Sequence, residues 1–199
     1  MIKKNNLNRN AGGLKSVAAD DNDAERRMIE LYCEMQGVFG QYVFWIREML
    51  VFIISGVKGR TEVIEKLKKQ SDLIGAAFGV YYDETVGQKI RRLYYDQSLL
   101  IIELARSYTY ENTRLYDGTL VALQDNNRQL TEYYLSLGEG YEFEVLSEFL
   151  TKNVDDTALQ IRRRFDGEFD GELSSFDSAY GNIISMADYL SDNIAKTIS

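Results

Sequence analysis

The chain of 199 residues contains no proline, no histidine and only one cysteine. Helix interiors reject proline, whereas loop-rich folds normally contain several, so its absence favours a protein made almost entirely of helices. Without histidine, the chain has neither a histidine general base nor a Ser–His or Cys–His nucleophile pair. Cys33 alone cannot form an internal disulfide, and most zinc sites need more Cys or His ligands than it supplies. We expect Cys33 to act as a small buried apolar side chain.

Long apolar runs and phosphate-binding loops are missing as well. The most apolar stretch, residues 42–57, is interrupted by Arg47 and Glu48 and is too short to span a bilayer. We therefore expect a buried helix face there and no membrane span. The N-terminus lacks the apolar core of a signal peptide, and a lone cysteine suits a reducing compartment, so we expect an intracellular location. The glycines of residues 56–59 lack the spacing of a phosphate-binding loop.

Charge is distributed unevenly along the chain. The net charge of −8 disfavours nucleic acid as a partner of the protein body. Residues 1–19, in contrast, contain no acid, and residues 1–21 are polar and aperiodic, which predicts a flexible tail. We expect a single helical-bundle domain over residues 22–199 and a basic tail over residues 1–21. The tail residues expected to contact a neighbouring protein are Lys3, Lys4, Arg9 and Lys15.

Apolar residues recur at helical spacing after the tail, which predicts an all-α, up-down bundle of four to six helices. Asn22 and Glu25 have the spacing of a capping box and predict the start of the first helix, which we expect to end near Ser55. One side of this helix carries an apolar stripe that repeats every seven residues. Its members are Met28, Met35, Tyr42 and Met49.

The remaining helices are separated by polar or glycine-containing breaks. A short helical insertion is expected after Thr61, with glycines weakening its end. Thr85 and Gln88 form a second capping box, which predicts the start of the next helix. Breaks at residues 109–112 and 138–140 then delimit two further helices.

Residues 158–177, ALQIRRRFDGEFDGELSSFD, allow three interpretations. They could continue one long helix to the C-terminus, because an apolar stripe of period 3.6 runs through them. They could form a helical hairpin that turns at Asp166 and Gly167. Three arginines would then fill the last turn of one helix and three acids the first turns of the next, as the helix dipole favours. The match of helix lengths favours the hairpin.

The third interpretation of this stretch is a calcium-binding loop at residues 166–177. Its acids and Gly171 occupy ligand and glycine positions of a twelve-residue EF-hand loop. Position 12 is Asp177 instead of the bidentate glutamate, and the bulky Phe169 stands at position 4. Both departures weaken this interpretation.

Four segments resemble an uncharacterised family of small helical-bundle proteins from bacteria and large DNA viruses. They are QYVFWIR at 41–47, QSDLIG at 70–75, YYDE at 81–84 and MADYL at 186–190, where the family has W-T-R and M-A-D-x-L patterns. The resemblance implies a helical bundle. The family pattern places one histidine on each of four helices, which would suit a metal site. Because this chain has other residues there, the resemblance argues against a metal. The corresponding positions are Tyr42, Gln97, Phe149 and Asn182.

Carboxylates and tyrosines are the remaining candidates for function. Six carboxylates on or near helix faces could in principle meet, although solvated surface charge is the more ordinary role. They are Glu34, Glu48, Asp96, Glu103, Glu148 and Asp188. The 14 tyrosines include three adjacent pairs, and one member of each helical pair should leave the core. Tyrosine is enriched at protein–protein interfaces.

Together these patterns predict a non-enzymatic structural or interaction module of a larger assembly, such as a virion, that binds a protein partner or itself. We expect no catalytic residue, cofactor or metal ligand. The alternative is a bundle that binds a metal or small ligand through carboxylates, including Ca²⁺ at residues 166–177. An enzyme that uses buried carboxylates in place of histidine is a third hypothesis.

Overall fold

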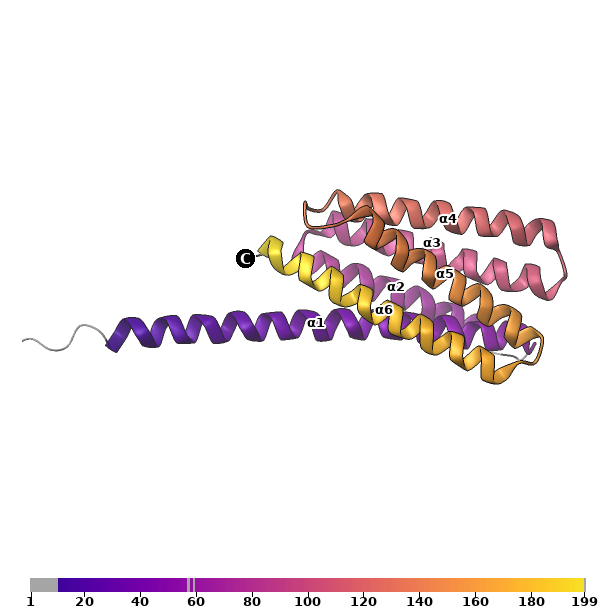
Figure 1. Cartoon of the computed structure of the whole chain (residues 1–199), viewed down its shortest axis with the longest axis horizontal. Helices are drawn as coiled ribbons and strands as arrows, with labels where there is room; N and C mark the ends of the chain where they lie inside the picture. Colours follow the sequence, from indigo (N-terminus) through magenta and orange to yellow (C-terminus); the bar gives the residue numbers. More distant parts are fainter. Residues whose placement is uncertain (1–10, 57, 59, 199) are drawn as a thin grey trace, which may run out of the picture.

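The computed structural model describes residues 11–56, 58 and 60–198, with the backbone alone for residues 11–24, 60 and 198. This part of the chain forms six helices and no strand, as Figure 1 shows. The helices are α1 (Ala11–Ile54), α2 (Arg60–Tyr81), α3 (Glu84–Thr109), α4 (Thr113–Leu135), α5 (Phe143–Phe165) and α6 (Phe169–Ile198). The predicted all-helical bundle is confirmed.

Consecutive helices pack against each other and are joined by short connections, and α1 also packs against α3, α5 and α6. Apolar stripes of the helices therefore face one shared core, as amphipathic helices require. The largest fully buried side chains in this core include Leu31, Met35, Phe39, Phe78, Tyr94 and Tyr134.

Helix α1 begins at Ala11, so the predicted start at Asn22 is wrong. The Asn22–Glu25 pair lies inside the helix, because lengthening an existing helix needs no new nucleation and the preceding residues include several good helix formers. Of the predicted tail, Lys3, Lys4 and Arg9 lie outside the described residues. Lys15 lies in α1, where only the backbone is described.

Helix α2 has 22 residues and is nearly as long as α4 and α5, so it is a full member of the bundle and the predicted short insertion is wrong. Its glycines do not weaken its end. A Cβ atom on Gly75 would lie 2.6 Å from the Gly87 carbonyl oxygen, and one on Gly87 would lie 2.5 Å from the Gly75 carbonyl oxygen. These glycines let the backbones of α2 and α3 come into direct contact.

Helix α3 begins two residues earlier than a cap at Thr85 would require. Asp83 is the cap, and its carboxylate accepts a hydrogen bond of 2.9 Å from the Val86 amide. Gln88 bonds instead to Glu84 on the helix surface. The predicted Thr85 cap is wrong because an aspartate in the same short connection makes an equally favourable cap.

The predicted hairpin between α5 and α6 is confirmed. Gly167 has a φ of +79°, and the amides of Glu168 and Gly167 donate to the carbonyls of Arg163 and Arg164 at 2.8 and 3.4 Å. This pair of bonds is the Schellman arrangement, which satisfies the last carbonyls of a helix and needs a left-handed residue. The single-helix interpretation is therefore wrong.

The calcium-loop interpretation is also wrong in its geometry. Residues 169–177 belong to α6, so the twelve residues do not form the loop that would wrap their oxygen atoms around an ion. Within the described residues, no group of three or more Cys, Asp or Glu side chains is placed to hold a metal ion.

Candidate interaction surface

A line of buried amide and hydroxyl groups crosses the middle of the bundle. The Tyr42 hydroxyl on α1 donates to Gln97 on α3 at 3.1 Å, and the Gln97 amide donates to Asn127 on α4 at 3.0 Å. Asn127 then donates to the Leu150 carbonyl on α5 at 3.0 Å. Gln97 is thus a hydrogen-bonded core amide. Each bond fixes the register of one helix against the next.

The four positions that the resemblance would align with histidines lie in two contacting pairs. Tyr42 bonds to Gln97, and the Asn182 amide on α6 donates to the Phe149 carbonyl and to Asn153 at 2.8 Å each. A cavity of about 20 Å³ lies beside Tyr42, Gln97 and Asn153. A single water molecule needs roughly that volume, so this polar layer is too tightly packed to admit a small ligand.

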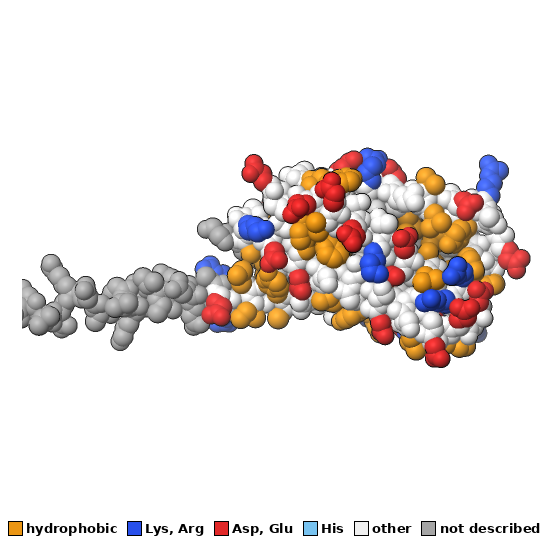
Figure 2. All heavy atoms as spheres, in the orientation of Figure 1, with side chains coloured by type: hydrophobic (Ala, Val, Ile, Leu, Met, Phe, Trp, Pro, Cys, Tyr) orange, Lys and Arg blue, Asp and Glu red, His pale blue; other side chains and the backbone are white. Residues whose placement is uncertain are grey.

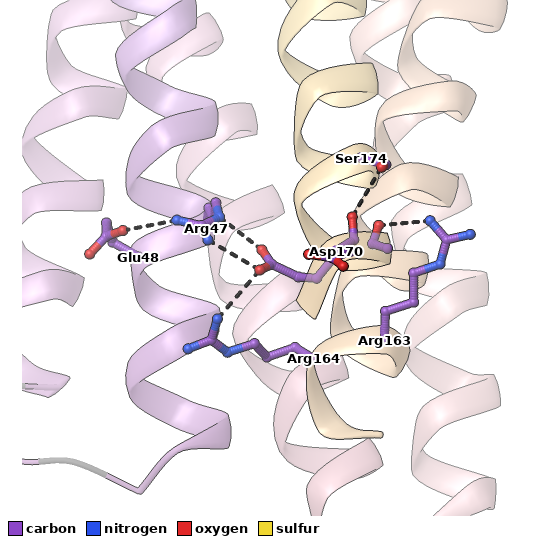
Figure 3. Close-up of polar contacts among 8 residues, drawn as sticks. Arg47, Glu48, Arg163, Arg164, Asp170 and Ser174 are labelled. Carbon is purple, nitrogen blue, oxygen red and sulfur yellow. Dashed lines mark hydrogen bonds and ion pairs between the residues drawn. The ribbon is translucent and has the colours of Figure 1, made fainter. Parts of the chain in front are cut away.

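Glu172, only 2 % exposed, ties the C-terminal hairpin to α1. Arg47 on α1 donates to both of its carboxylate oxygens, at 2.8 and 3.1 Å, and Arg164 on α5 lies at 3.4 Å (Figure 3). The two guanidinium groups also lie over the rings of Phe176 and Phe169, each 5.2 Å from the centroid. Two cations around one buried carboxylate form a structural clamp of three helices.

The arginine run at 162–164 serves the hairpin itself. Arg164 binds Glu172, while Arg163 donates to the Gly171 carbonyl at 2.8 Å and to the Ser175 hydroxyl at 2.7 Å. Figure 3 shows Arg163 and Arg164 reaching α6 on separate sides. The run acts first as a helix end, as the sequence indicated, and two of its side chains are used inside the molecule.

The six candidate carboxylates are not brought together. Four of them form separate pairs with a tyrosine, an arginine or an amide near the surface. The pairs are Glu34 with Tyr81 at 3.3 Å, Glu48 with Arg47 at 3.5 Å, Asp96 with Arg92 at 3.7 Å and Asp188 with Gln36 at 2.6 Å. Glu103 and Glu148 are not buried.

Cys33 is exposed, so the expectation of a buried cysteine is wrong. It lies on α1 two residues after Leu31, and successive residues on a helix point about 100° apart, so Leu31 occupies the core-facing position instead.

Several tyrosines are core residues that pair with one another. Tyr94 and Tyr134 are buried, and their hydroxyls lie 3.0 Å apart, while the neighbouring Tyr95 and Tyr133 lie at the edge of the core. In each of the adjacent pairs Tyr94–Tyr95 and Tyr133–Tyr134, one side chain lies in the core and the other at its edge, as predicted. Burial raises the pKa of Tyr94 and of Tyr134. Several of the tyrosines that suggested an interface therefore belong to the core, where their hydroxyls contact each other.

The first part of α1 extends beyond the other helices, as Figure 1 shows, and we call residues 11–30 the α1 arm. Residues 25–30 are exposed, whereas Leu31 is fully buried, so the bundle begins at Leu31. At about 1.5 Å per residue the arm is about 30 Å long.

The core stripe of α1 does not stop where the bundle stops. Met35 is fully buried, but Met28, one heptad earlier, is 49 % exposed and Ile29 is 58 % exposed. The core-facing stripe of α1 therefore continues past the bundle as half-exposed apolar side chains. Sequence periodicity identified this stripe but could not indicate where its covering helices end.

Within the described residues, one helical segment, Glu25–Ile54, is long and apolar enough to cross a membrane by composition and length alone. Of its apolar window, 44 % is buried inside the bundle. A core helix of this length passes the same test, so the segment is weak evidence for a membrane span.

Figure 2 shows acidic, basic and apolar side chains mixed over one face of the bundle. This face gives no single charged or apolar region from which a partner could be identified. The exposed end of the α1 apolar stripe, at Met28 and Ile29, remains the clearest candidate contact surface. Comparison of the chain with protein-family models, with curated proteins and with solved structures found no match.

Proposed function

We propose that this protein is a non-enzymatic structural building block that associates with further copies of itself through the α1 arm. The observation that carries the proposal is the exposed continuation of the core stripe at Met28. The resemblance to proteins of large DNA viruses makes a virion one assembly in which such a block would serve.

The physical reason is that helix propensity alone gives little stability to a helical segment that extends beyond its bundle. Most helical stability in proteins comes from packing an apolar face against another element. Burial of one Met or Ile side chain contributes about 1.5–3 kcal/mol, so a partner that covers Met28 and Ile29 would stabilise the arm.

The non-enzymatic part of the proposal is supported by the distribution of the polar groups. Four of the six candidate carboxylates lie in separate pairs, and Glu172 is held by two arginines. The buried amide layer satisfies its own hydrogen bonds across the helices.

We expect the substitution Met28→Glu to weaken self-association, because it places a charge in the apolar stripe of the arm. Sedimentation equilibrium of the wild-type and variant chains measures the association constant. Val121→Glu is the matched control, because Val121 is 65 % exposed on α4 and lies away from the arm. Its association should equal that of the wild type.

The melting temperature of each variant should stay that of the wild type, since both positions are exposed. A wild-type chain that remains monomeric at every concentration would refute the proposal. Equal weakening by Met28→Glu and Val121→Glu would show that association does not use the arm.

A further inference from the structure

A hollow of about 300 Å³ opens where α3 ends, α4 begins and α5 ends, and we call it the aromatic hollow. One ring from each helix lines it: Tyr108 on α3, Tyr116 on α4 and Phe165 on α5. Figure 1 shows the α3–α4 connection and the α5–α6 turn at the same end of the bundle. Small-ligand pockets have volumes of roughly 300–1,000 Å³, so this hollow suits a small head group or a single side chain.

The three rings stand at steep angles to one another. The ring centroids of Tyr108 and Tyr116 are 5.7 Å apart, with 58° between the planes. Those of Tyr108 and Phe165 are 5.3 Å apart, with 85° between the planes. Phe165 is 41 % exposed, and both tyrosines are half-buried. The rings therefore form walls around one open space instead of a closed stack.

A carboxylate stands beside these rings. Glu111 is the one charged residue that lines the hollow, and its side chain forms no ion pair or hydrogen bond with any described residue. Its φ is +53°, and the amides of Glu111 and Asn112 donate to the carbonyls of Tyr108 and Ser107 at 3.0 and 2.9 Å. This Schellman arrangement favours glycine at the left-handed position, so a glutamate there lowers stability and the fold alone does not account for it.

The charges around the rings are mostly negative. Burial raises the pKa of Tyr108 and of Tyr116, and Asp166 and Asp117 add to the increase, whereas Arg162 lowers both values. With the glutamate that lines the hollow, three acids therefore lie near the rings against one base. Arg162 is exposed and does not line the hollow, so it leaves the space between the rings open.

Rings and a carboxylate together select a cation with an apolar surface. The face of an aromatic ring is negative and attracts a cation within about 6 Å of its centroid. An anion would be repelled by Glu111, and a neutral apolar group would remove water from its carboxylate without replacing the lost contacts. A metal ion needs several oxygen ligands, and only one carboxylate lines the hollow.

We propose that the aromatic hollow binds a methylated ammonium group. Its methyl groups lie against Tyr108, Tyr116 and Phe165, and its charge lies beside Glu111. A free molecule such as choline and a trimethylated lysine of a protein present this same chemistry. Figure 1 shows the α1 arm at the opposite end of the bundle, so this binding goes beyond the proposed self-association and does not depend on it.

An NMR titration that follows the methyl protons of choline tests the site. The comparison is its neutral isostere, in which a carbon atom replaces the nitrogen. Choline should bind about tenfold more tightly than the isostere, because only the cation is attracted by the rings and the carboxylate. Its methyl resonance should move upfield, since protons over the face of a ring are shielded. Equal binding of the two compounds, or no binding of choline, would overturn the proposal.

The substitution Phe165→Leu tests the rings. Leucine keeps an apolar side chain but removes the π face, so the affinity for choline should fall about fivefold. Phe143→Leu is the matched control, because Phe143 is 48 % exposed at the start of α5 and does not line the hollow. It should bind choline like the wild type. Equal weakening by the two substitutions would contradict the proposed site.

The substitution Glu111→Gly separates ligand binding from stability. Glycine relieves the left-handed backbone, so the melting temperature should rise, while choline should bind about threefold more weakly without the carboxylate. Glu111→Gln should weaken binding by a similar factor. Glu139→Gln changes an exposed carboxylate in the α4–α5 connection and should not. Unchanged binding by both variants of Glu111 would count against the site.

A capped Gly–trimethyllysine–Gly tripeptide identifies the source of the group. Tighter binding of this peptide than of choline supports a protein side chain, and the reverse order supports a free molecule. The unmodified Gly–Lys–Gly peptide should bind more weakly, and equal binding of the two peptides would refute recognition of the methyl groups. Sedimentation equilibrium of Phe165→Leu should match the wild type, so a failure of this proposal is distinct from a failure of self-association.

Discussion

Glu172 shows how much can depend on one side chain. It is buried between two helix ends, and its charge is balanced by Arg47 and Arg164. We expect Glu172→Ala to lower the free energy of unfolding by about 3 kcal/mol, because it leaves two arginines facing a buried space without their anion. Chemical denaturation of both proteins measures the difference.

The control is Glu132→Ala, which removes an exposed partner of Arg128 within one helix. Surface pairs of this kind contribute about 0.2–1 kcal/mol, so the control should change stability little. Equal effects of the two substitutions would mean that the Glu172 clamp contributes no more than a surface ion pair.

At the scale of single residues, the sequence predicted the two helix ends of the hairpin but not the residue of α1 that the hairpin contacts. The charge reversal around Gly167 indicated two helix ends from local dipole preferences. That Glu172 would be shared with Arg47 could not be deduced, because the two residues are 125 positions apart and nothing local relates them. The buried bond between Gln97 and Asn127 is similar, because the two residues lie on different helices 30 positions apart.

At the scale of helices, glycine has opposite effects in different elements. We expect Gly75→Ala and Gly87→Ala each to lower the free energy of unfolding by about 1–3 kcal/mol, since the new methyl group would overlap the neighbouring backbone. Gly118→Ala on α4 is the matched control, because no atom of a neighbour lies within 4 Å of its added Cβ. It should raise stability by about 1 kcal/mol through helix propensity.

Thermal or denaturant unfolding of the three variants measures whether each substitution lowers or raises the free energy of unfolding. Stabilisation by Gly75→Ala would contradict the close contact of α2 and α3.

Helix existence was predictable from periodicity, and helix boundaries were less so. The hairpin turn and the break before α4 follow from glycine and capping chemistry that acts over a few residues. Asn22 and Thr85 were good caps by type, but the chain used an earlier start at Ala11 and a competing cap at Asp83. The candidate surface was harder to predict, because exposure of Met28 depends on where five other helices end.

For the whole molecule, buried tyrosines predict a loss of stability in alkali. Burial raises the pKa of Tyr42, Tyr94, Tyr134 and Tyr141 above the ordinary value near 10. The folded state therefore keeps protons that the unfolded state releases above about pH 10. The free energy of unfolding should stay constant with respect to these groups at lower pH and fall as the pH rises past that value.

Each such tyrosine contributes a slope of about 1.4 kcal/mol per pH unit. Denaturant unfolding at a series of pH values measures the total slope, and Tyr94→Phe should reduce it by one such step. A stability that is independent of pH well above 10 would contradict the prediction.

The length of α1 has a consequence for symmetry. Copies whose arms contact each other, or that exchange arms around a twofold axis, close as a dimer with no arm left free. Copies in which each arm contacts a different surface of the next copy instead form a closed ring or a filament with unlike ends, one of which offers a free arm. Growth of such a filament would be directional, and a fragment that contains the arm alone would cap one end.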